Sequence, residues 1–213
     1  MKIAQYYDDK QIRLGVIEGN ALLPLEFQGS MTDFLAQGTP ERPRGPAIAL
    51  DSIRFAPVVS RPSKIIALGL NYLDHAKESK GAIPKVPLIF AKFPNSLIGH
   101  KEPVTWAAEI TKKVDFEAEL AVIIGKEIYR PQPHEVMDAV FGYACANDVS
   151  ARDLQFGDGQ WVRGKSLDTF CPLGPWIVTR DEIPDPHALG IKTVVNGTTM
   201  QDSSTTMMIF KIS

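Results

Sequence analysis

Short apolar segments that end at turn-forming residues constrain this fold more than any other feature of the sequence. Near the N-terminus the segments KIAQYY, IRLGVIEG and ALLPL are separated by turn-forming residues around positions 8–10 and 19–20, a pattern typical of β-hairpins. Near the other end, Asn196 and Gly197 lie between two further apolar segments, and this dipeptide predicts a tight type I′ hairpin. Stretches with helical character are few and short. The sequence therefore predicts a mixed α+β fold that is dominated by β-structure.

Two proline-rich stretches divide the chain into parts. Ser30 is placed to cap a short helix, since a serine before an amphipathic segment is a common helix start. The stretch GTPERPRGP at 38–46 follows this helix, and APVVSRP at 56–62 precedes a return to apolar sequence, so both are expected to be loops. We therefore predict a small β-rich N-terminal domain at 1–60 and a larger domain at 61–213.

Composition argues against several classes of partner. The 213 residues carry a formal net charge of -2, which gives no electrostatic reason to expect a nucleic acid or an anionic membrane as partner. No segment approaches the roughly 18 apolar residues of a membrane span, and the N-terminus has no apolar stretch of the signal-peptide type. Cys145 and Cys171 have neither metal-site spacing nor a disulfide framework, so we expect two buried free thiols. These features predict a soluble protein of the reducing cytoplasm.

An acidic strand is the first candidate for a functional site. In the segment VDFEAELAVIIG at 114–125, alternation along a strand places Asp115, Glu117 and Glu119 on one face. Side chains two residues apart on a strand are separated by about 6.6 Å, so the carboxylates of Glu117 and Glu119 can converge on one cation. Asp148, at the end of another apolar segment, offers a third oxygen ligand for a hard divalent ion. The alternative is the solvated face of an edge strand.

The segment GLNYLDHAKESK holds a second candidate. If a helix begins near Leu73, then His75 and Glu78 are at i and i+3 and lie on one helix face. The carboxylate can then orient the imidazole and raise its basicity, which is a general-base arrangement. The alternative is a surface histidine beside an acid.

The segment QWVRGKSLDTFCPLGPW holds the third candidate. Lys165 lies between a glycine and a serine in what reads as a shaped loop, where its ammonium could reach an anionic substrate or a developing oxyanion. The alternative is an ordinary solvated charge.

Four motifs in order give the chain a family resemblance. The segments GLNYLDHAKE, DFEAELAVIIG, YACANDVSARDLQ and RGKSLDTFCPLGPW resemble the fumarylacetoacetate hydrolase family, and the match runs from about Lys64 to the end of the chain. The resemblance implies a mixed β-roll, commonly in a homodimer, with Mg²⁺ as the usual ion and Mn²⁺ or Ca²⁺ as alternatives. The site residues that it implies are Glu117, Glu119 and Asp148 as metal ligands, His75 and Glu78 as the pair that activates water, Lys165 in the substrate pocket, and Arg152 and Gln155 as further substrate-binding residues.

The resemblance also implies a reaction. The expected function is metal-dependent hydrolysis of a carbon–carbon bond in an acylpyruvate-like β-dicarbonyl or 2-oxo acid, a small-molecule substrate of the kind found in aromatic catabolism. Isomerisation, tautomerisation or decarboxylation of 2-oxo or 2-hydroxydienoate acids at the same metal site is the first alternative, and a shortened non-catalytic member is the second. The family's domain normally continues beyond the segment matched by SSTTMMIFKIS, so we expect 61–213 to lack the C-terminal part of that domain.

Overall fold

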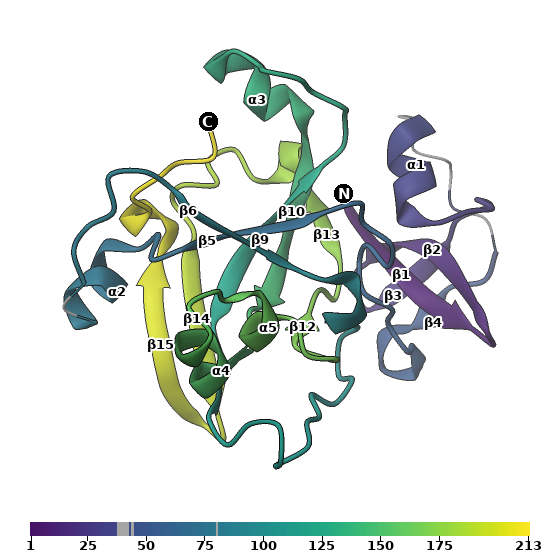
Figure 1. Cartoon of the computed structure of the whole chain (residues 1–213). Helices are drawn as coiled ribbons and strands as arrows, with labels where there is room; N and C mark the ends of the chain where they lie inside the picture. The colour runs from purple at the N-terminus through teal and green to yellow at the C-terminus, as the bar shows by residue number, and fades with distance from the viewer. Residues whose placement is uncertain (38–42, 44, 80) are drawn as a thin grey trace.

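The structure, a computed structural model, describes residues 1–37, 43, 45–79 and 81–213 (Figure 1). Strands dominate its regular structure and the helices are short, which confirms the fold class predicted from the sequence. The strands are β1 (Lys2–Asp8), β2 (Gln11–Glu18), β3 (Ala21–Pro24), β4 (Ile48–Ala49), β5 (Ile65–Gly69), β6 (Leu88–Lys92), β7 (Leu97–Ile98), β8 (Val114–Asp115), β9 (Ala118–Ile124), β10 (Val140–Asn147), β11 (Ser150–Ala151), β12 (Cys171–Pro172), β13 (Ile177–Thr179), β14 (Gly190–Val195) and β15 (Thr198–Ser204). The helices are α1 (Met31–Gln37), α2 (Leu73–Glu78), α3 (Pro133–Ala139), α4 (Arg152–Gly157) and α5 (Val162–Lys165), with 3₁₀ turns η1 (Leu50–Ser52), η2 (Pro94–Ser96), η3 (Arg180–Glu182) and η4 (Thr205–Met207). None of the helices in these ranges is long and apolar enough to cross a membrane.

One antiparallel sheet extends through most of the molecule, in the strand order β4-β3-β2-β1-β13-β10-β9. β1 pairs with β2 along its length and with β13 near its start, where Ile3 lies opposite Ile177. The N-terminal hairpins and the central strands β9 and β10 therefore belong to the same sheet (Figure 1). The domain division near residue 60 stays a prediction, and the expected loop at 38–46 lies mostly outside the described residues.

The turns expected from the sequence are formed. The β1–β2 connection contains Asp9 with φ 53°, and the β2–β3 connection contains Gly19 with φ 55°. Asn196 and Gly197 join β14 to β15 with φ values of 50° and 81°, and positive φ at both central positions is what a type I′ turn requires. The sequence pattern therefore located these hairpins correctly.

The start of α1 is capped as expected. The Ser30 N–H donates to Asp33 Oδ2 at 2.8 Å, and the Asp33 N–H donates to Ser30 Oγ at 3.3 Å. This reciprocal pair satisfies donors that a helix start leaves without partners. The helix then turns Met31 and Phe34, which are 0% and 3% exposed, toward the sheet. Their burial fixes α1 against β1 and β2, beside which it lies in Figure 1.

The acidic segment 114–125 is not one strand, so this prediction was wrong. It forms β8 and β9 with two residues between them, and β8 pairs with β11 whereas β9 pairs with β10. The physical reason lies at Glu117, whose N–H donates at 3.0 Å to the side-chain oxygen of Asn147. A side-chain acceptor there replaces a carbonyl of the strand ladder, and the chain leaves the sheet for two residues.

Two predictions of burial were also wrong. The apolar segment KIIALGL at 64–70 predicts a buried strand, and it does form β5, but Ile66 is 59% and Leu68 is 39% exposed. These two side chains lie on the same face of β5, so that face of the β5–β6 ribbon is uncovered in the part of the chain that the structure describes. Cys171 is a buried free thiol, whereas Cys145 is free but exposed, because it points away from the core side chain Ala144 that precedes it on β10.

Candidate functional site

Three carboxylates come from the facing ends of β9 and β10. The two strands pair with Ala118 opposite Asn147, and the Asp148 N–H donates to the Glu117 carbonyl at 2.9 Å just beyond this pair. This bond places Glu117, which precedes β9, beside Asp148, which follows β10. Glu119 is the second residue of β9. The antiparallel pairing therefore gathers the predicted metal ligands at one place in the sheet.

Lys165 lies between two of these carboxylates. Its Nζ donates to Glu117 Oε2 and to Asp148 Oδ2, both at 2.7 Å, and it lies 5.1 Å from the ring centroid of Phe90. Lys165 is only 1% exposed. The interpretation of Lys165 as a solvated charge was therefore wrong, and its role in a substrate pocket stays a prediction.

Gly164 explains how a helix can carry Lys165 into this site. A Cβ atom at this position would lie 2.6 Å from the backbone nitrogen of Gln155 and 2.8 Å from the Ala151 carbonyl oxygen. Only a residue without a side chain lets α5 pack this closely on the start of α4. The glycine before the lysine is thus a packing requirement of the site.

Lys92 is a central residue that the sequence reasoning missed. It is 3% exposed, and its Nζ donates to Asp148 Oδ1 at 2.7 Å, to the Val149 carbonyl at 3.2 Å and to the Lys165 carbonyl. Burial lowers the pKa of Lys92, and the charge of Asp148 opposes this effect. The only indication of Lys92 in the sequence is its place at the end of the apolar segment VPLIFAKF. Lysines whose ammonium reaches solvent commonly have the same pattern.

Burial and neighbouring charges set the carboxylate pKa values apart. Burial, together with the negative charges of Glu117 and Asp148, raises the pKa of Glu119 to about 8. Burial also acts to raise the pKa of Asp148, but Lys92 and Lys165 outweigh it and hold that pKa below its ordinary value. Among the described residues none makes a hydrogen bond or ion pair with the Glu119 carboxylate. Glu119 is therefore a half-buried acid beside two others, and no cation of the described part of the chain pairs with it.

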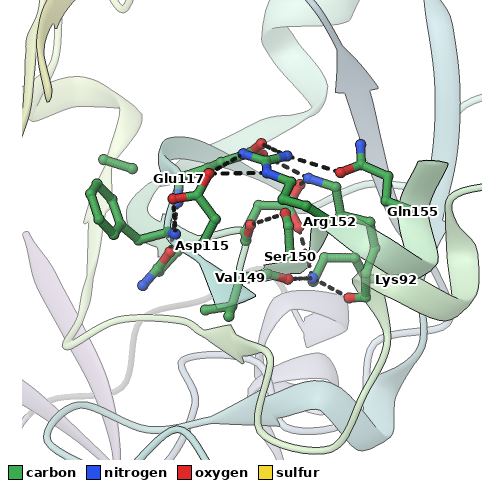
Figure 2. A network of polar contacts seen from close by, with 12 residues as sticks. Lys92, Asp115, Glu117, Val149, Ser150, Arg152 and Gln155 are labelled. Carbon is green, nitrogen blue, oxygen red and sulfur yellow. Dashed lines mark hydrogen bonds and ion pairs between the residues drawn. The ribbon is translucent and has the colours of Figure 1, made fainter. Parts of the chain in front are cut away.

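Arg152 lies on the outer side of the same cluster. Its guanidinium binds Asp115 Oδ2 through Nε at 3.0 Å and Nη2 at 2.7 Å, and its Nη1 contacts Glu117 Oε1 at 2.7 Å. Nη1 also donates to Gln155 Oε1 at 2.9 Å, as Figure 2 shows. Arg152 and Gln155 thus hold protein groups in this structure, and their role in substrate binding stays a prediction.

His75 and Glu78 lie on α2, as expected, but both are exposed. In the part of the chain that the structure describes, neither side chain makes a hydrogen bond or ion pair, so the expected contact between them is not formed here. The preceding residue Asp74 accepts a hydrogen bond from the Ser203 hydroxyl, which anchors α2 beside β15 (Figure 1). The general-base role of the pair stays a prediction.

Tyr72 is a second residue that the sequence reasoning missed. Its hydroxyl is buried and has no hydrogen-bond partner among the described residues. Burial, followed by the charges of Glu119 and Asp74, raises the pKa of Tyr72, which places this phenol near the acidic cluster. Nothing in the sequence NYLDH distinguished it from a core tyrosine.

The donor set fits a hard divalent cation in its chemistry. All three predicted ligands are carboxylates, which suit Mg²⁺, Mn²⁺ or Ca²⁺, and the unpaired buried carboxylate of Glu119 calls for a cation. Within the described ranges, however, no three His, Cys, Asp or Glu side chains are arranged to hold a metal ion, and Lys165 bridges Glu117 and Asp148 instead. The ligand set therefore stays a prediction.

Comparisons with known proteins agree on one family. The family model described as fumarylacetoacetate (FAA) hydrolase, C-terminal, matches residues 64–213. The rat protein (Rattus norvegicus) named oxaloacetate tautomerase Fahd2a, mitochondrial, is 47% identical over 167 residues, which cover 78% of this chain and 53% of the relative. The chain thus spans about half the length of this relative. The name of the rat protein includes a mitochondrial location. The cytoplasmic location expected for this chain therefore stays a prediction.

Solved structures give the same result for the fold. A fumarylacetoacetate hydrolase from Exiguobacterium antarcticum is 36% identical with a TM-score of 0.87, over 98% of this chain and 76% of that one. A maleylpyruvate hydrolase from Sphingobium sp. SYK-6, in complex with manganese(II) and pyruvate, is 28% identical with a TM-score of 0.80, over 100% of this chain and 80% of that one. These matches confirm the β-roll that the resemblance implied.

Proposed function

We propose, because this chain belongs to the fumarylacetoacetate hydrolase family, that it is a divalent-metal-dependent enzyme that interconverts the keto and enol forms of a 2-oxo acid. Oxaloacetate is the substrate we would test first, since the 47% identical rat protein is named an oxaloacetate tautomerase. Carbon–carbon hydrolysis was the expectation from the sequence, and the His75–Glu78 pair was its main support. The contact within that pair is not formed in this structure, so tautomerisation moves ahead of hydrolysis.

The observation that carries the proposal is the buried set of alternating charges around Asp148. Asp148 is 7% and Lys165 is 1% exposed, so the site can surround a charged substrate with fixed charges in a largely dry setting, where such interactions are strong. Enolisation develops negative charge on a carbonyl oxygen, and Lys165 Nζ is a donor of the right kind to stabilise it. A bound divalent cation, held by Glu117, Glu119 and Asp148, would supply Lewis-acid polarisation and a counter-charge.

A tautomerase must also move one proton between the substrate carbon and oxygen. We assign the removal of the carbon-bound proton to His75, because imidazole is the commonest general base in enzymes. Tyr72, with a buried hydroxyl beside the acidic cluster, is placed three residues before His75. Its hydroxyl can donate to the substrate oxygen. Neither role requires a bond of the substrate skeleton to break.

The test is the decay of enol-oxaloacetate, followed by its ultraviolet absorbance with purified protein. We expect faster decay with Mn²⁺ or Mg²⁺, loss of this effect with excess EDTA, and a reduction by about 10²–10⁴-fold in His75→Ala, the usual contribution of a general base. No acceleration by a protein with metal demonstrably bound would overturn the proposal. It would favour the non-catalytic alternative.

Hydrolysis of an acylpyruvate is the second candidate. It is favoured by the likeness to the maleylpyruvate hydrolase over 100% of this chain. An acylpyruvate panel would separate the reactions by their products: pyruvate plus a carboxylic acid for hydrolysis, carbon dioxide for decarboxylation, and an isomer of unchanged mass for tautomerisation. Exclusive formation of pyruvate and acid would move hydrolysis to first place. The homodimer that the resemblance implies is likewise a proposal, which light scattering of the purified protein would test.

A further inference from the structure

We propose that Lys165 and the divalent cation occupy the acidic site alternately, so that the ammonium closes the metal-free site and must leave Glu117 and Asp148 when the metal binds. The inference rests on the metal site of the proposed function. It adds a specific competitor for that metal and assigns the competition to one side chain of this chain.

The carboxylate oxygens of Glu117 and Asp148 are divided among three cationic side chains. Glu117 gives Oε1 to Arg152 and Oε2 to Lys165. Asp148 gives Oδ1 to Lys92 and Oδ2 to Lys165. In Figure 2 Arg152 contacts Glu117, and Lys92 belongs to the same network of polar contacts. The two oxygens that remain for a shared cation are therefore the two that Lys165 already holds, at 2.7 Å each.

The two buried lysines differ in the groups that hold their ammonium nitrogens. An ammonium has three N–H donors, and Lys92 uses them on Asp148 and on the carbonyls of Val149 and Lys165. Lys92 is thus fully bound, partly to backbone that cannot move away. Among the described residues Lys165 Nζ donates only to its two carboxylates, and its four-carbon stem is flexible. Lys165 is therefore the cation that can exchange.

The negative charges of the three carboxylates also favour exchange of the Lys165 ammonium for a divalent ion. Lys165 neutralises parts of Glu117 and Asp148 but leaves Glu119 beside them with no cation within the described residues. A divalent ion that reached all three would compensate more negative charge than one ammonium does. A metal that bound while the ammonium stayed in place would instead meet a like charge at the same oxygens. Exchange avoids this repulsion, and it frees the Lys165 ammonium for the negative charge that develops on the substrate oxygen.

The test is calorimetric titration of Mn²⁺ into the full chain and three variants. Lys165→Met removes the competitor, so we expect Mn²⁺ to bind on the order of tenfold tighter or more, since Glu117 Oε2 and Asp148 Oδ2 each lose their partner. Lys165→Arg keeps the charge and presents a fork that matches two carboxylates, so we expect weaker Mn²⁺ binding. Lys113→Met is the control, because Lys113 is exposed, lies two residues before Asp115 and contacts none of the three carboxylates. We expect its affinity to stay near that of the unchanged protein.

The outcomes separate this inference from the metal site itself. Equal Mn²⁺ affinity in the unchanged protein, Lys165→Met and Lys165→Arg would overturn the exchange and leave the metal site standing. Equal gains in Lys165→Met and Lys113→Met would also overturn it, since general charge would then explain the effect. No Mn²⁺ binding in any of the proteins would overturn both. If Lys165→Met does not fold without metal, Lys165→Arg carries the test by its opposite sign.

Discussion

Two buried regions of the molecule differ in the side chains that fill them. One lies between β1, β2 and α1, and the other surrounds Asp148. The first is almost entirely apolar, and its one large buried polar side chain, Gln5, is satisfied by the Pro57 carbonyl at 2.6 Å and the Met31 N–H at 2.9 Å. The second buries Lys92, Asp148 and Lys165 together. Apolar burial is additive and tolerant, whereas buried charges are stable only in matched sets. The proposed reaction is therefore assigned to the buried region that is least tolerant of substitution.

The change expected to have the largest effect is Lys92→Met. It removes the ammonium that donates to Asp148 Oδ1 and to the carbonyls of Val149 and Lys165, and breaking a buried ion pair in this way costs about 3–5 kcal/mol of unfolding free energy. Urea denaturation would measure it. Lys192→Met is the control, because Lys192 pairs with Asp202 at 3.1 Å on the surface, and such pairs contribute only about 0–1 kcal/mol. Similar losses in both variants would show that the network around Asp148 is not stabilising.

Leu14→Ala probes the apolar interior. Leu14 is 0% exposed within the core cluster, and truncation of a buried leucine costs about 2–5 kcal/mol. The same denaturation experiment measures this loss, and Mn²⁺ affinity should stay unchanged because Leu14 lies outside the charged network. A coupled loss of Mn²⁺ affinity would contradict the separation of the two interiors.

The pH dependence of stability distinguishes the charged interior in a second way. The pKa of Glu119 is raised by burial to about 8, so the folded metal-free protein keeps a proton that the unfolded chain releases at lower pH. Stability from this group is therefore present at acidic pH and is lost as pH rises toward 8. Melting temperatures in EDTA should fall more for the unchanged protein than for Glu119→Gln between pH 6 and pH 8. Parallel pH profiles would show that Glu119 is not a buried acid.

Ser30→Ala should have the smallest effect. It removes the side-chain acceptor for the Asp33 N–H at the start of α1, and loss of a serine cap costs about 1 kcal/mol. Thr32→Ala, one residue into the same helix, provides a control at an exposed position. A loss as large as that of Leu14→Ala would mean that the cap, and not apolar burial, holds α1 on the sheet.

Local chemistry explains which parts of the fold could be predicted from the sequence. Asn196-Gly197 and Ser30 act within a few residues of themselves, so the hairpin and the helix start followed from sequence alone. The pairing of β1 with β13 joins residues far apart in the chain, and nothing local encodes it. The break between β8 and β9 depends on the side chain of Asn147, which only the assembled sheet brings into reach.

The site shows the same division. Carboxylates at alternating positions were visible in the sequence, as was Lys165 beside Gly164. Lys92 was not, because a lysine at the end of an apolar strand has the same pattern whether its ammonium is buried or in water. The contact expected between His75 and Glu78 followed from helix spacing alone, and spacing permits such a contact without requiring it.

The central claim is that Glu117, Glu119 and Asp148 form a metal site and not only a structural network of ion pairs. Electron paramagnetic resonance tests it most directly, because the signal of free aqueous Mn²⁺ is lost on binding. We expect one Mn²⁺ ion to bind per chain, binding to be abolished in Glu117→Ala, and Asp115→Asn to keep it, since Asp115 contacts Arg152 but is not an expected ligand. Equal binding in the unchanged protein and Glu117→Ala, or no binding in either, would contradict the account.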